Sequence, residues 1–212
     1  SMFLLWELMT VAAFFLVIFD NTLESIRAGI KYFLMSEMGA LFMLVAVIAV
    51  YLQEGTVDMA RLSSRGMTVS STFTHILLLF FLMGTGVKAG IIPIHTWLPD
   101  AHPAAPSPVS ALLSGVMIKV GIYLLIRIFC QIFVQIISWQ FVLCVLGSLS
   151  IVIAMMMAII QKDAKRLLAY SSIGQIGYMV LGIGTGLSIG IAGGLFHLIN
   201  HALFKGLLQS GL

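Results

Sequence analysis

Apolar runs of about 20 residues follow one another through nearly the whole of this 212-residue chain. A run of that length crosses a hydrocarbon core of roughly 30 Å as a helix. Hydrophobic residues make up 60% of the sequence, charged residues make up 9%, and the mean hydropathy is +1.11. A soluble domain carries roughly 25% charged residues, and the runs lack the alternation of barrel strands. We therefore predict an all-α, polytopic helical membrane bundle.

The apolar runs predict seven membrane spans in a single transmembrane domain that covers residues 1–212. The third span contains a break, so the bundle is expected to include one discontinuous helix. No stretch is left over for a soluble domain. The predicted spans cover residues 2–19, 30–52, 72–98, 108–130, 138–160, 165–184 and 190–209.

Basic residues favour one orientation of the bundle. On one side, the loops are edged by Arg27, Lys31, Lys162, Lys165 and Arg166. On the other side, they are edged by Arg61, Arg65 and Arg127. Cytoplasmic loops carry an excess of lysine and arginine. We therefore expect the QKDAKR loop to be cytoplasmic and the first residue to lie outside.

Two other classes of site are disfavoured. The net charge of +3 comes from scattered residues, whereas a nucleic-acid footprint needs basic residues clustered on one face. Cys130 and Cys144 show no C-x-x-C spacing, which favours two buried thiols over a metal or redox site. We therefore expect no nucleic-acid partner and no metal.

Several ionisable side chains fall inside the predicted spans. A charge at the bilayer centre costs roughly 2.5–3.5 kcal/mol on insertion scales, so it usually faces a partner or a water-filled cavity. Lys119 has mostly apolar sequence on both sides, so its ammonium group lies too deep to reach the interface easily. Snorkelling to the interface stays open for Lys205 and Glu37. The candidate residues are Glu7, Lys88, Lys119, His197, His201 and Lys205.

Helix-weakening residues surround Lys88. Glycines flank it on both sides, and Pro93 cannot donate a hydrogen bond to the carbonyl of Ala89, four residues earlier. Broken helices recur at ion sites in transporters. Gly90 and Pro93 therefore predict a helix break beside an ion site, with an ordinary proline kink as the alternative.

The last span carries a polar stripe. His197, Asn200, His201 and Lys205 follow an i, i+3, i+4, i+8 spacing and so are expected to share one helical face. The stripe could bind zinc, form hydrogen bonds between helices, or relay protons, for which histidine is suited. No carboxylate or cysteine lies nearby in the sequence to complete a zinc site.

A buried lysine can join such a relay. Burial and a neighbouring carboxylate change the proton affinity of a lysine in opposite directions. Glu7 beside Lys88 would therefore form a switch, although spacing alone does not show that the two side chains touch.

Four motifs occur in a characteristic order: WELMTVAAFFLV at 6–17, GVKAGIIPIHTWLPDAHPAAPSPVSALLSGVMIKVGIY at 86–123, QKDAKRLLAYSSIGQIGYM at 161–179 and HLINHALFKGLL at 197–208. Together they resemble the antiporter-like proton-translocating membrane subunits. That family is shared by respiratory complex I, the Mrp cation/proton antiporters and the membrane-bound [NiFe] hydrogenases. The wording HPAAPSPVSALLSGVMIK is most similar to the hydrogenase-4 and formate hydrogenlyase branch.

The resemblance implies roles for the candidate residues. Glu7 corresponds to the glutamate of the family's fifth helix, and Lys88 corresponds to the lysine of its first discontinuous helix. In the family these two form the pair that gates proton transfer. Lys119 corresponds to the central relay lysine. The polar axis toward the second half-channel would then be formed by His197, His201 and Lys205.

The resemblance also implies an architecture and a setting. The chain would be part of an inverted-repeat transporter fold and would cover only the family's fifth to eleventh helices, so we expect a fragment of a longer protein. Family members carry no cofactor, and electron transfer occurs in partner subunits. The expected function is translocation of protons or other cations by a non-redox subunit of a redox-driven pump, such as a membrane-bound hydrogenase or an NADH:quinone oxidoreductase. Its partners would be other membrane subunits in the inner (plasma) membrane.

Two alternatives remain. The chain could be a non-conducting structural anchor of such a complex, in which the buried charges serve assembly only. His95 and Asp100 also match the H-x4-D spacing of lipid acyltransferases, in which the histidine acts as a general base and the aspartate orients it. The acyltransferase reading leaves Glu7, Lys88 and Lys119 without a role.

Overall fold

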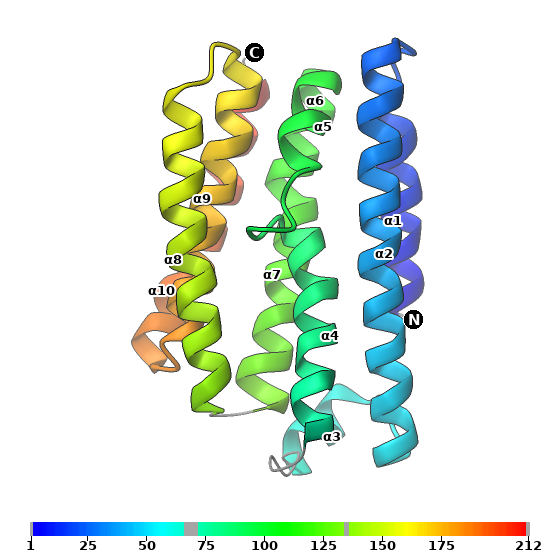
Figure 1. Ribbon diagram of the computed structural model, residues 1–212, viewed down its shortest axis with the longest axis vertical. Helices are drawn as coiled ribbons and strands as arrows, with labels where there is room; N and C mark the ends of the chain where they lie inside the picture. Colours follow the sequence, from blue (N-terminus) through cyan, green and yellow to red (C-terminus); the bar gives the residue numbers. More distant parts are fainter. Residues whose placement is uncertain (1, 66–71, 134–135, 211–212) are drawn as a thin grey trace.

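Long helices lie side by side in one bundle in the computed structural model, which describes residues 2–65, 72–133 and 136–210 (Figure 1). Within these residues the structure contains helices and no strand. The α-helices are α1 (Met2–Val17), α2 (Leu23–Glu54), α3 (Met59–Arg65), α4 (Thr72–Ala89), α5 (Leu98–Ala104), α6 (Ser107–Leu112), α7 (Ile118–Ile126), α8 (Ile137–Ile159), α9 (Ala164–Gly184) and α10 (Ser188–Ser210). The π-helices η1 (Leu113–Met117) and η2 (Arg127–Ile132) flank α7.

The helices confirm the predicted membrane bundle. Six of them are long and apolar enough to cross a membrane: α2, α4, the continuous segment Ser107–Ile132, α8, α9 and α10. The first predicted span corresponds to α1, a shorter apolar helix of 16 residues. The described helices thus follow the seven apolar runs of the sequence.

Capping residues in the sequence determine where α2 begins and ends and where α9 begins. The Thr22 and Ser25 side chains accept hydrogen bonds from each other's backbone N–H groups and so cap α2. Gly55 ends α2 in the left-handed conformation, with φ of 66°, where glycine has no steric cost. At the start of α9 the Asp163 carboxylate accepts the Arg166 N–H at 3.1 Å. Both capped starts lie at the end of the bundle that also holds α5 (Figure 1).

A break separates α4 from α5. Helix α4 ends one residue before Gly90, whose φ of 76° turns the chain out of the helix. Other groups satisfy backbone atoms that the break leaves free: the Trp97 indole donates to the Val87 carbonyl at 2.7 Å, and the Ile92 N–H donates to Ser150 Oγ at 3.2 Å. Non-helical backbone at membrane depth is tolerated where protein buries it in this way.

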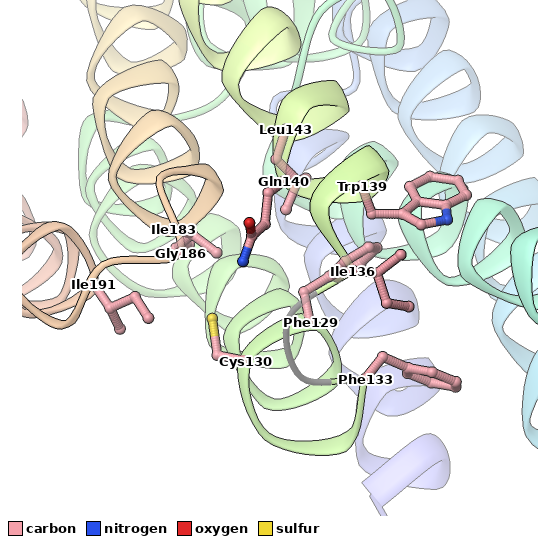
Figure 2. Close-up of a pocket in the computed structure, with 10 residues that line it drawn as sticks. All are labelled: Phe129, Cys130, Phe133, Ile136, Trp139, Gln140, Leu143, Ile183, Gly186 and Ile191. Carbon is pink, nitrogen blue, oxygen red and sulfur yellow. The ribbon is translucent and has the colours of Figure 1, made fainter. Parts of the chain in front are cut away.

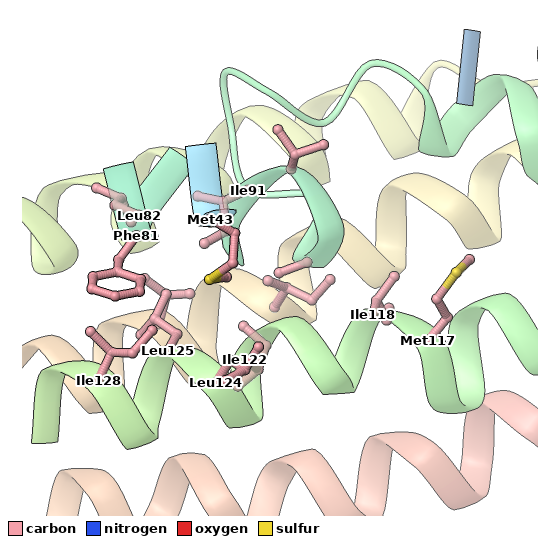
Figure 3. Packing of buried hydrophobic residues seen from close by; sticks show 14 of the residues in the cluster. Met43, Phe81, Leu82, Ile91, Met117, Ile118, Ile122, Leu124, Leu125 and Ile128 are labelled. Carbon is pink, nitrogen blue, oxygen red and sulfur yellow. The ribbon is translucent and has the colours of Figure 1, made fainter. Parts of the chain in front are cut away.

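Apolar packing between α4 and α7 forms the centre of the core. Figure 3 shows Phe81 of α4 facing Leu125 of α7 and Ile128 of η2, and all three side chains are buried. The two helices are in close contact at Gly121, where an added Cβ atom would lie 2.7 Å from the Ala89 nitrogen. The lack of a side chain at Gly121 therefore allows the helices that carry the buried lysines 88 and 119 to pack together.

We expect Gly121→Ala to destabilise the protein by about 1–3 kcal/mol, because the new methyl group forces the α4 and α7 backbones apart. Thermal unfolding of the purified complex measures the effect. Gly115→Ala is the matched control, because an added Cβ there lies 3.7 Å from its nearest neighbour, the Ala202 carbonyl. Equal unfolding temperatures for the two variants would contradict the packing argument.

The loops fall at the two ends of the bundle as predicted. The loop before α2, the segment around α5 and α6, and the loop between α8 and α9 lie at one end, and α3 lies at the other (Figure 1). The first residue, for which an outside position is predicted, lies outside the described residues.

Candidate functional site

Lys88 lies near the break, at the end of α4, and the residue is 1% exposed. Its Nζ donates to Thr10 Oγ1 of α1 at 2.6 Å and to the Tyr32 hydroxyl of α2 at 3.4 Å. The same atom lies 5.4 Å from the centroid of the Trp6 ring, within the range of a cation–π interaction. Two helices, α1 and α2, therefore supply neutral groups around Lys88.

Within the described residues, no oxygen of Glu7 lies within 4.0 Å of Lys88 Nζ, so the two side chains do not form an ion pair. It lies one helical turn before Thr10 and interacts electrostatically with Lys88 and with Glu37 of α2. Glu37, for which snorkelling is one expectation, thus lies near Glu7. The structure brings Glu7 close to Lys88 without direct contact.

Lys119 lies at the start of α7, directly after η1, and is 6% exposed. Its Nζ donates to the backbone carbonyl of Ser114, which belongs to η1. Short π-helical segments are rare, and those that occur often lie at functional sites. The Ser114 hydroxyl lies 3.0 Å from the Ser172 hydroxyl of α9, so η1 connects Lys119 to α9.

Lys205 of α10 approaches the same part of α9 and is 1% exposed. Its Nζ donates to the Leu168 carbonyl at 2.9 Å, and the Ser172 hydroxyl donates to that same carbonyl at 3.0 Å. Lys119 and Lys205 are electrostatic neighbours. Burial of Lys205 excludes snorkelling to the surface of the described bundle.

The residues around Lys88 form a first cluster, and Lys119 and Lys205 belong to a second. His201 is fully buried within this second cluster and interacts electrostatically with both lysines. Within the described residues neither of its ring nitrogens has a hydrogen-bond partner. Its ring stacks on that of His197, with centroids 6.1 Å apart. His197 is half-buried, and its Nε2 lies 2.7 Å from Gln175 Oε1.

The polar face of α10 differs from the predicted stripe at one residue. Asn200 is exposed, so it does not share the buried face of His201 and Lys205. That face continues instead to Gln209, whose amide nitrogen lies 3.2 Å from Nδ1 of the fully buried His102. The prediction that Asn200 belongs to this face is wrong. Asn200 follows His197 by three residues and so lies at one edge of the stripe, whereas the edge that contains His201 and Lys205 packs against neighbouring helices.

Tyr32 joins the two clusters. Its hydroxyl accepts the Lys88 hydrogen bond and lies 3.2 Å from the sulfur of Met117, two residues before Lys119. The side chain is fully buried and its ring packs against Trp97, with centroids 5.0 Å apart. A single aromatic residue thus contacts both the break and η1.

The three buried lysines share one property. Within the described ranges, no carboxylate oxygen lies within the 4.0 Å ion-pair limit of Lys88, Lys119 or Lys205. Among the described residues, their hydrogen bonds go to hydroxyls and backbone carbonyls. A buried charge without a counter-ion is expensive. No permanent counter-ion therefore fixes the protonation state of these side chains.

Asp100 of α5 is the centre of an ionic cluster at the end of the bundle where α2 and α9 begin. Its two oxygens accept hydrogen bonds from Lys31 of α2 and Arg166 of α9, each at 2.6 Å. Asp100 is not hydrogen-bonded to His95 in the part of the chain that the structure describes. The geometry that an H-x4-D acyltransferase requires is therefore not formed.

Burial raises the pKa of the Asp100 carboxyl, but the hydrogen bonds and charges of Lys31 and Arg166 outweigh it and hold the pKa below its ordinary value. A carboxyl whose pKa is lowered by folding stabilises the folded state at pH above its unfolded pKa. That stabilisation is lost as the pH falls through the folded pKa. The ionic cluster is therefore complete at neutral and mildly acidic pH.

We expect Asp100→Asn to destabilise the complex by at most about 1 kcal/mol, because the three groups are partly exposed. The difference from wild type should be constant between pH 7 and about pH 5, above the ordinary aspartate pKa, and should shrink at high salt. Thermal unfolding at several pH values and salt concentrations measures it. A difference that vanishes by pH 5 would show that the Asp100 pKa is not lowered.

A small cavity lies away from these clusters, between η2, the start of α8 and the end of α9 (Figure 2). Its lining contains no lysine, histidine or carboxylate. Cys130, which lines it, and Cys144 are free thiols and are half-buried, less buried than predicted. No group of three potential metal-ligating side chains occurs among the residues described.

Several residues of the site were missed by the sequence reasoning. Gln209 could have been found, because it continues the i+4 spacing beyond Lys205. The others are ordinary hydroxyl-bearing residues within apolar helices, and no local pattern marks them. They are Thr10, Tyr32, Ser114 and Ser172.

The chain is similar to known membrane proteins along nearly its whole length. The family described as "NADH:quinone oxidoreductase/Mrp antiporter, TM" matches residues 1–210. The chain is 38% identical to "Hydrogenase-4 component B" of Escherichia coli (strain K12), over 98% of this chain and 33% of that protein. It is 33% identical to "NADH-quinone oxidoreductase subunit N" of Desulforudis audaxviator (strain MP104C), over 97% of this chain and 42% of that protein.

A solved structure agrees with the fold. A chain of the membrane-bound sulfane sulfur reductase, an archaeal respiratory membrane complex, superposes with a TM-score of 0.90 at 33% identity, over 98% of this chain and 43% of that chain. The chain thus spans less than half the length of these relatives.

Proposed function

The chain belongs to the NADH:quinone oxidoreductase/Mrp antiporter membrane family, and from this premise we propose that it translocates protons as a non-redox subunit of a redox-driven ion pump. One observation carries the proposal. Lys88, Lys119 and Lys205 are buried and contact neutral acceptors, with no carboxylate within 4.0 Å among the described residues. Such groups can gain and lose protons without breaking an ion pair.

In the proposed relay, Glu7 and Lys88 form the first station, beside the broken helix at Gly90 and Pro93. A proton that arrives on or leaves Glu7 changes the field at Lys88, which responds by releasing or binding a proton. Glu7 and Lys88 interact electrostatically, which such a switch requires. Direct contact is not needed, because the coupling is through the field.

The second station comprises Lys119, His201 and Lys205, with His197 at its edge. These groups come from α7 and α10 and are electrostatic neighbours. A proton on one of them disfavours a proton on the next, so that each transfer drives the following one. His201 suits the middle position, because its ring nitrogens are free within the described residues and imidazole both accepts and donates protons.

The setting follows from the relatives. Hydrogenase-4 component B and NADH-quinone oxidoreductase subunit N are components of larger assemblies by their names. We infer that this chain acts beside other membrane subunits in the inner membrane, with electron transfer in its partners and no cofactor of its own. The Lys162 end of the bundle would face the cytoplasm, which labelling of a Lys162→Cys variant with a membrane-impermeant maleimide tests.

The function is tested on inverted membrane vesicles that contain the complete complex. An internal pH dye reports proton uptake when hydrogen, formate or NADH is supplied, and a strain without the gene provides the background. We expect uptake that persists in sodium-free buffer and collapses with a protonophore. Uptake that requires sodium would favour another cation, and uptake equal to the background would favour the structural anchor.

A further inference from the structure

Two serine hydroxyls lie between the second-station lysines. Ser114 of η1 and Ser172 of α9 are fully buried, and their Oγ atoms lie 3.0 Å apart. We call this pair the serine bridge. It crosses from the helix segment that carries Lys119 to the helix that receives Lys205.

Each lysine is held at a carbonyl next to the bridge. Lys119 Nζ donates to the backbone carbonyl of Ser114 itself. Lys205 Nζ donates to the Leu168 carbonyl, which also accepts the Ser172 hydroxyl at 3.0 Å. A carbonyl oxygen has two lone pairs and can accept both bonds. The acceptors of the two ammonium groups are therefore connected through the serine bridge.

The hydrogen-bond polarity of the bridge can be assigned. A serine hydroxyl has one proton to donate, and Ser172 donates its proton to the Leu168 carbonyl. The Ser172 oxygen must then accept in the 3.0 Å contact, so Ser114 is the donor. Both hydroxyl protons point from the Lys119 side toward the Lys205 side. The bridge thus fixes the position of Ser114 in η1 relative to Ser172 in α9.

We propose that the serine bridge is a positioning element of the relay: it holds the acceptor carbonyls of Lys119 and Lys205 at the separation that allows proton transfer between the two lysines. This inference rests on the proposed function. Neither hydroxyl is required to carry the proton. Without the bridge, η1 and α9 lose the hydrogen bond that joins them here. The separation of the two ammonium groups is then no longer fixed.

The test is a double-mutant cycle in the complete complex, with proton uptake per assembled complex as the readout. Ser114→Ala and Ser172→Ala each remove the serine bridge, and Ser172→Ala also removes the hydrogen bond to the Leu168 carbonyl. We therefore expect each variant to lower uptake about threefold to tenfold. The double variant should be no slower than the slower single variant, because the bond can be lost only once. The pH profile of uptake should move in all three variants.

Ser172→Thr keeps the hydroxyl and should retain most of the uptake. Thr85→Val is the matched control, since it removes a fully buried hydroxyl whose hydrogen bonds, among the residues described, go to the Phe81 and Leu82 carbonyls of α4. Single variants with the wild-type rate and pH profile, or single effects that multiply in the double variant, would overturn the proposal. If Lys119→Met also left uptake unchanged, the proposed function itself would fail.

Discussion

Lys88→Met should abolish most proton uptake by the complex without weakening its fold. Methionine keeps much of the apolar stem and removes the ammonium group that donates to Thr10 at 2.6 Å. General acid–base groups typically contribute 10²–10⁴-fold to rates, so we expect uptake to fall on the order of a hundredfold. We expect stability to be unchanged or higher, because exchanging a buried charge for an apolar group of similar volume is often neutral or stabilising.

The combination of these two results separates the proposed function from the structural anchor. If the buried charge served assembly only, Lys88→Met would reduce the amount or the unfolding temperature of the complex and leave uptake per complex unchanged. Subunit content, thermal unfolding and uptake are therefore measured on the same membranes. Lys162→Met is the matched control, since Lys162 is an exposed lysine in the loop before α9.

Lys119 is expected to show a graded response to substitution. Lys119→Met removes the titrating group from the second station and should reduce uptake by a similar factor of about a hundred. Lys119→His should retain part of the activity, because imidazole still binds and releases protons near neutral pH. Both variants lose the hydrogen bond to the Ser114 carbonyl in its present form, so a purely structural role would affect them alike. Equal uptake by the two variants would contradict a relay role for Lys119.

The sequence predicted those features of the fold that depend on neighbouring residues in the chain, namely the helix spans and the helix break. The break next to Lys88 follows from Gly90, whose positive φ ends α4, and the helix spans follow from apolar run length. The break is also stabilised by groups distant in sequence, such as the Ser150 hydroxyl on α8. Nothing in the residues around Gly90 indicates that partner.

The surroundings of the lysines could not be predicted, because they depend on how separate helices pack. Thr10 and Lys88 lie 78 residues apart in the chain, and Ser114 and Ser172 lie 58 residues apart. Which side chains meet is decided by the relative rotation of the helices and by close contacts such as that at Gly121. A helical stripe predicts a shared face, but not which of its edges is covered, as Asn200 shows by its exposure.

The central claim is that protons pass through lysines that lack a fixed counter-ion, and proton uptake per assembled complex in Lys119→Met vesicles tests it most directly. The wild-type complex, the Lys119→Met complex and the Lys162→Met control are compared at equal subunit content, with the same electron donor and in sodium-free buffer. We predict that Lys119→Met assembles normally and takes up protons on the order of a hundredfold more slowly than the other two. Uptake at the wild-type rate by the assembled Lys119→Met complex would contradict the account.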